Sequence, residues 1–178
     1  MAIAFGASLG TANGGGSTTK SLTSLSISGS DIAILAVVYT ETVTKTVSSV
    51  VWDNGSGGSS ESFTQIGTYQ DIEAGNHRIS LWRLVTTNTS NSRILATISA
   101  NDQMALGAVY YTGTDQTTPI TDITQTNDAT SPGSQLNTSN LDGSWQIGIN
   151  HSPSPVMNLD SGGLERQQYY LGATEYAF

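Results

Sequence analysis

The sequence predicts an all-β protein, specifically an antiparallel β-sandwich with long Gly- and Ser-rich loops. Short apolar stretches recur along the chain with turn-forming residues between them. None of these stretches continues with the period of a helix of ordinary length. The stretch 145–149 alternates large apolar residues with small or polar ones, which is the pattern of a half-buried strand.

The expected strands follow one another at the spacing of strands, with turn signals between them. In chain order they are 3–9, 22–27, 32–39, 47–52, 63–66, 79–85, 94–98, 104–111, 120–123, a weak stretch around Leu136, 145–149 and 168–171. The stretch 32–38 has no polar position, so both of its faces should be covered. This pattern favours a central strand of packed sheets over a strand at an oligomer interface.

Two glycine-rich stretches, 13–17 and 54–60, are expected to be mobile surface loops, because glycine holds no single strand conformation without outside contacts. After the apolar stretch 107–111, the Thr, Asp and Gln side chains of 112–118 should bond to nearby backbone groups. Pro119 removes a backbone donor there. These features predict a turn whose side chains fix the shape of the backbone and carry out no chemistry.

No long linker divides the chain, so we expect one β-sandwich domain over 1–178. The segments 1–20 and 164–178 are the candidate contacts between subunits. The formal net charge of −8 disfavours nucleic-acid binding, because the phosphate backbone would be repelled. The longest apolar run, 32–39, is too short to cross a membrane, and the start lacks the basic residues of a signal peptide.

Several motifs resemble a β-sandwich module, of the jelly-roll or concanavalin-like kind, that recurs in tailed-phage structural proteins and bacterial surface proteins. The resemblance covers about 22–149, and its most specific motif is Asp115-Gln116-Thr117-Thr118-Pro119. The other motifs lie at 47–52, 78–84, 107–114 and 141–147. The resemblance implies a jelly-roll-like sandwich in a virion setting, without a defined activity.

The residues do not favour an enzyme, so no catalytic residue is expected. A serine hydrolase needs an imidazole base, and His77 and His151 are expected at strand ends on the surface. A glycosidase needs two carboxyl groups across a cleft, and Asp71 with Glu73 is more simply a solvated turn. No cofactor is expected, although a structural calcium ion could bind loop oxygens. The loop residues concerned are Asp53, Asn54, Asp115, Asp122, Asp128, Asp142 and Asp160.

Aromatic residues supply the candidate binding residues. Sugar-binding sandwiches stack exposed rings on sugars, which favours Trp52 beside the glycine-rich loop, together with Asn54 and Tyr69. Trp82 is expected in the core or in a contact between sheets. Aromatic and apolar residues near the two termini are the candidate protein interface, because such residues bury large areas. They are Ile3, Phe5, Tyr169, Tyr170, Tyr176 and Phe178.

These patterns together favour a non-enzymatic phage virion structural protein, assembled in the host cytoplasm. The leading expectation is a capsid decoration (cement) protein that binds the major capsid protein or other virion subunits as a homo-oligomer, a trimer being one such state. The alternative is a carbohydrate- or receptor-binding module of a phage tail or a bacterial surface protein, which would act outside the cell. The C-terminal tail would add an edge strand either to its own domain or to a neighbour.

Overall fold

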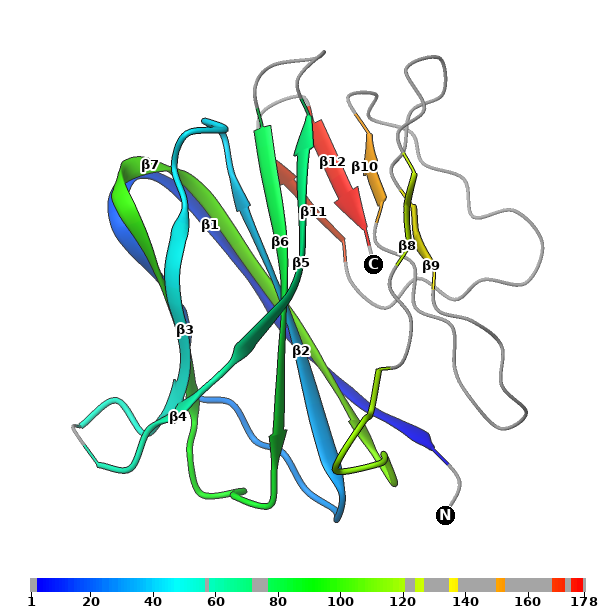
Figure 1. Ribbon diagram of the computed structural model, residues 1–178. Coiled ribbons are helices and arrows are strands. Elements are labelled where there is room, and N and C mark those ends of the chain that lie inside the picture. Colours follow the sequence, from blue (N-terminus) through cyan, green and yellow to red (C-terminus); the bar gives the residue numbers. More distant parts are fainter. Residues whose placement is uncertain are drawn as a thin grey trace. The chain divides into compact units, whose positions relative to one another are not determined.

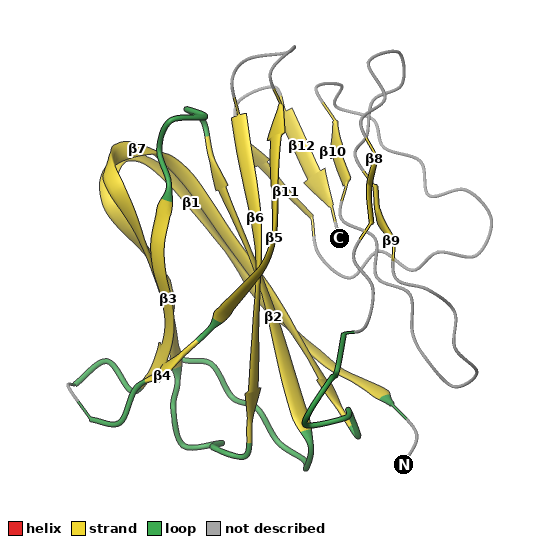
Figure 2. Cartoon of the chain, in the orientation of Figure 1, coloured by secondary structure: helices red, strands yellow, loops and turns green. Residues whose placement is uncertain are grey.

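The structure is a computed structural model of residues 1–178. It describes residues 3–56, 58–71, 77–120, 124–126, 135–137, 150–152, 168–171 and 174–177, and side chains within 3–56, 58–68 and 78–120. The described chain consists of strands joined by turns and coil, with no helix (Figure 2). None of its elements is therefore a helix able to span a membrane. The all-β prediction is confirmed.

The chain divides into two compact units, Met1–Pro119 and Ile120–Phe178. The first unit is built on one seven-stranded antiparallel sheet. Its strands are β1 (Ala4–Leu22), β2 (Ile32–Thr40), β3 (Val47–Asp53), β4 (Glu61–Ser62), β5 (Thr64–Asp71), β6 (His77–Thr86) and β7 (Arg93–Thr112). The expectation that 1–178 forms a single domain stays a prediction.

The 20-residue strand β7 organises this sheet. Its first part, 93–98, pairs with β3, and its second part, 104–111, pairs with β2. The 19-residue strand β1 accompanies β7 along both parts, and the two run together as a long ribbon (Figure 1). Bulges interrupt the β1 ladder between Gly14 and Thr19, near the change of partner on β7. Bulges of this kind let a strand bend from one part of a sheet into another.

The sheet nearly closes on itself into a barrel-like shape. Only Phe63 separates β4, which pairs with β3, from β5, which pairs with β6. Since β6 pairs with β2 and β2 with β7, the pairing returns to β3. The amide of Phe63 donates to the carbonyl of Val50 at 2.9 Å, which fastens this junction.

Alternate residues of the strands fill the core. On β2 the inward set is Ile32, Ile34, Ala36 and Val38, and on β7 it is Met104, Leu106, Ala108 and Tyr110. All nine residues of β2 are buried, including those that point away from this core. The prediction that both faces of 32–38 are covered is confirmed.

Two sequence expectations about the long strands are wrong. The stretches 94–98 and 104–111 are parts of one strand, because the polar residues between them stay extended. The glycine-rich stretch 13–17 is not a loop but part of β1. Pairing with β7 supplies the outside contacts that glycine lacks, and Gly14 and Gly16 adopt φ angles of 141° and 72° that suit a bulged strand.

The turn after β7 is built as predicted. Thr114 donates from its amide and hydroxyl groups to the carbonyl of Asp31, at 3.0 and 2.7 Å, and Gln116 Nε2 donates to the Thr114 carbonyl at 3.1 Å. Asp115 Oδ1 accepts the amides of Thr117 and Thr118 at 2.7 and 2.9 Å. These bonds to the Asp115 carboxylate lower its pKa.

The second unit contains two small antiparallel groups of strands. The strands β8 (Thr124–Thr126) and β9 (Gln135–Asn137) form a pair. The strands β10 (Asn150–Ser152), β11 (Gln168–Leu171) and β12 (Thr174–Ala177) form a sheet with β12 in the middle. The expected strand 168–171 and the stretch around Leu136 are confirmed, while 145–149 and most of 120–123 lie outside the described residues.

Candidate ligand loop and contact segments

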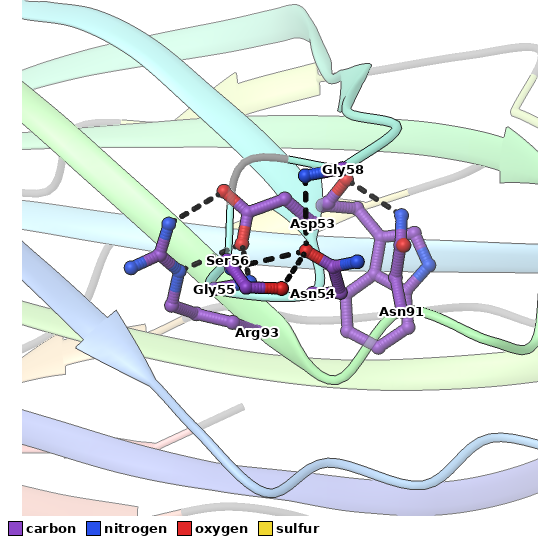
Figure 3. A network of polar contacts seen from close by, with 8 residues as sticks. Asp53, Asn54, Gly55, Ser56, Gly58, Asn91 and Arg93 are labelled. Carbon is purple, nitrogen blue, oxygen red and sulfur yellow. Dashed lines mark hydrogen bonds and ion pairs between the residues drawn. The ribbon is translucent and has the colours of Figure 1, made fainter.

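The glycine-rich loop 54–60 joins β3 to β4, and an ion pair fastens its base. Asp53 ends β3 opposite Arg93, the first residue of β7. Arg93 donates from Nε to Asp53 Oδ1 at 2.7 Å and from Nη2 to Oδ2 at 2.8 Å (Figure 3). The side chain of Asp53 is 11% exposed and that of Arg93 is 29% exposed. The bonds from Arg93 lower the pKa of Asp53 against the opposing effect of burial, and the Gly55 amide adds to the lowering.

Asn54 organises the exposed part of the loop. Its side-chain oxygen Oδ1 accepts hydrogen bonds from Ser56 N at 3.0 Å, Ser56 Oγ at 3.1 Å and Gly58 N at 3.3 Å (Figure 3). Beside it, the Gly55 amide donates to Asp53 Oδ1 at 2.9 Å, and Gly55 has a φ of 77°. An Asn side chain commonly builds turns in this way. The prediction of a surface loop at 54–60 is confirmed for its described residues.

The prediction that Trp52 presents an exposed ring is wrong. Its side chain is 0% exposed, because Val50 and Trp52 are the alternate residues of β3 that face the core. The indole Nε1 donates to the carbonyl of Asn88 at 3.2 Å, and Asn91 Nδ2 donates to the Trp52 carbonyl at 2.9 Å. A ring buried in this way has no face available for stacking on a sugar.

Of the other aromatic residues considered for sugar binding, two have buried side chains and one has a side chain outside the described residues. Trp82 is 7% exposed and donates to Ser80 Oγ at 2.8 Å, so its predicted core position is confirmed. Tyr111 is buried as well. Tyr69 lies on β5 opposite Ile79, and its side chain lies outside the described part of the chain.

A second polar group near Trp52 was missed by sequence reasoning. Thr86 donates from Oγ1 to Glu61 Oε2 at 2.7 Å and accepts the Asn88 amide at 2.8 Å. Asn88 is thus held on both sides, because its amide donates to Thr86 and its carbonyl accepts the indole of Trp52. Nothing in the sequence pattern indicates Thr86 or Asn88.

Arg93 was also missed, although the sequence carries a signal for it. Asp53 follows the expected strand 47–52 by one residue, and Arg93 precedes the expected strand 94–98 by one. Antiparallel pairing of these two strands brings the two charges together.

The N-terminal candidates lie at the start of β1. Ile3 and Phe5 are half-buried, and the Phe5 ring meets the Tyr111 ring edge to face, with centroids 5.7 Å apart. In the tail, Tyr169 on β11 pairs with Tyr176 on β12. The expected tail strand therefore forms within this chain. The side chains of Tyr169, Tyr170 and Tyr176, and the whole of Phe178, lie outside the described residues.

The candidates for catalysis and metal binding are only partly described. Asp71 and His77 are paired in the β5–β6 register and His151 lies on β10, while Glu73 lies outside the described residues. Among the described side chains, no group of three His, Asp or Glu residues could hold a metal ion. A structural calcium ion stays a prediction.

Comparison with known proteins adds no relative. No family model matches the sequence, and no curated protein and no solved structure matches it.

Proposed function

We propose that this protein is a non-enzymatic structural protein of a tailed-phage virion, and specifically a capsid decoration protein that bridges capsid subunits. The observation that carries the proposal is that polar side chains of the described residues take their hydrogen-bond partners from within the chain. Asp53, Asn54, Thr86, Asp102 and Asp115 all bond to the chain's own loops and strand ends. Such bonding stiffens a scaffold and supports a mechanical role.

The jelly-roll-like sandwich belongs to this proposal, together with the virion setting that the motif resemblance implies. The protein would bind the major capsid protein or other virion subunits as a homo-oligomer, in the trimeric state as a first expectation. Many modest contacts would then add through multivalency. The contact segments would be 1–20 and 164–178, with Ile3 and Phe5 at the start of the first.

The test is cosedimentation of the purified protein with expanded capsids of its source, together with its mass by light scattering. Saturable loading of an oligomer onto shells supports the proposal, and protein that stays in the supernatant contradicts it. Ile3→Asp should weaken loading, because it places a charge in the proposed contact. Thr44→Asp adds the same charge at an exposed turn position and should load normally.

A second candidate is a carbohydrate- or receptor-binding module of a tail or cell-surface protein, acting outside the cell. Its support is the exposed Asn54, whose side chain is held by hydrogen bonds from Ser56 and Gly58 and is therefore ordered before any ligand binds. Retention on a glycan array that Asn54→Ala or Tyr69→Ala abolishes would favour it. Trp52→Ala is unsuitable for this test, because removing this core ring should destabilise the fold by about 3–5 kcal/mol and a loss of binding would not report on a sugar contact.

A further inference from the structure

The loop 54–60 contains a reactive pair of residues. The backbone nitrogen that follows an asparagine can attack the side-chain amide carbon and form a five-membered succinimide ring. Glycine in the second position leaves this nitrogen unhindered, because it has no Cβ. The chain has two such pairs, Asn13–Gly14 and Asn54–Gly55, which differ in their surroundings.

The hydrogen bonds at Asn54 favour this attack. Since Oδ1 bonds to groups of Ser56 and Gly58, the side chain is folded over the peptide group that follows it. Ring closure transiently places negative charge on Oδ1, and three donors already point at that oxygen (Figure 3). Donors fixed where charge develops are the arrangement by which proteins accelerate acyl chemistry.

The attacking nitrogen is also held in place. The Gly55 N–H donates to Asp53 Oδ1 at 2.9 Å, so a carboxylate lies beside the proton that must leave. Asp53 is itself fixed by Arg93, which keeps this acceptor in position. Asn54, Gly55 and Ser56 are exposed, so water can reach the ring once it forms.

Asn13–Gly14 provides a comparison within the same chain. Asn13 is also exposed, but it lies in β1 opposite Ala105 of β7. Ring closure requires the backbone to leave the extended conformation that this pairing maintains. The fold therefore opposes the reaction at Asn13.

We propose that Asn54 is a self-modification site, at which the folded loop promotes deamidation. Gly55 N attacks Asn54 Cγ and loses its proton to base, and Nδ2 takes up a proton and leaves as ammonia. Water then opens the succinimide at either carbonyl, which yields aspartate or isoaspartate. The net change is the hydrolysis of one amide, and it adds one negative charge beside Asp53.

The test is peptide mapping by mass spectrometry of the full-length protein after incubation at neutral and mildly alkaline pH. We expect the Asn54 peptide to gain the mass of an amide-to-acid change severalfold faster than the Asn13 peptide. We also expect Asn54 to react more slowly in the same chain unfolded by urea. Equal or faster reaction of Asn54 in urea would overturn the proposal, because the folded loop would then give no acceleration.

Two variants separate the role of the donors from general loop flexibility. Ser56→Ala removes the hydroxyl donor to Oδ1 and should slow the reaction severalfold. Ser60→Ala removes an exposed hydroxyl of the same loop that does not bond to Asn54. In this variant Asn54 should deamidate at the same rate as in the unsubstituted protein. An unchanged rate in Ser56→Ala, or equal slowing in both variants, would contradict the assigned role of the donors.

Discussion

Replacing Trp52 by Phe should destabilise the protein by about 2–3 kcal/mol. The side chain is fully buried, so the smaller ring leaves about 40 Å³ empty, which costs about 1 kcal/mol at about 24 cal/mol per Å³. The variant also removes the donor to the Asn88 carbonyl, and an orphaned polar group costs about 1–3 kcal/mol. Because Asn88 is half-buried, water can partly replace the lost bond, and we take the second cost as about 1–2 kcal/mol.

The assay is urea unfolding followed by far-ultraviolet circular dichroism, because the substitution removes a fluorophore. The matched control is Val51→Ala on the same strand, since Val51 is half-buried and points away from the core face of Val50 and Trp52. We expect the control to lose less stability than Trp52→Phe. A loss below about 0.5 kcal/mol for Trp52→Phe, the range of ordinary surface changes, would refute the assigned core position.

Three further changes probe other parts of the first unit. Arg93→Met should lower the free energy of unfolding by about 1 kcal/mol at neutral pH. Since Arg93 lowers the Asp53 pKa, the full difference between the variant and the unmodified protein should be present above the ordinary Asp pKa of 3.8, and urea titrations should show it disappear as the pH falls below that value. Gly6→Ala should lower the free energy of unfolding by about 1–3 kcal/mol, because a Cβ there would overlap the Tyr110 ring; unchanged stability would contradict that packing. Asp115→Ala should speed hydrogen exchange of the two amides bonded to that carboxylate, whereas Asp115→Asn, which keeps an acceptor oxygen, should change it less.

The sequence predicts individual strands better than their connections. The apolar stretch 32–39 and the buried face of Trp82 follow from side-chain pattern alone, and the structure agrees with both. The continuity of β7 could not be predicted, because its polar middle is extended only through its partner strands. The same holds for 13–17, whose glycines have no preference for a strand but are held by β7.

For the ligand candidates as well, the sequence predicts some positions correctly and others wrongly. The position of Asn54 in an exposed loop follows from the surrounding glycines. The position of Trp52 was predicted wrongly because its nearness to the loop was given more weight than its alternation with Val50. The hydrogen-bond partners of Trp52, Asn88 and Asn91, lie far along the chain from it, and only the folded chain brings them to the indole and the carbonyl.

The strand β7 also determines when this protein can fold during synthesis. Ala4 is one of the first described residues, yet it pairs with Thr112, and β3 also needs β7 beside it. A nascent chain that has reached only β6 therefore holds β1 without its strand partner. Pairings so distant in sequence are formed slowly, because a long loop must close before any bond is gained. The first unit should consequently assemble late on the ribosome, in a step that begins when β7 emerges.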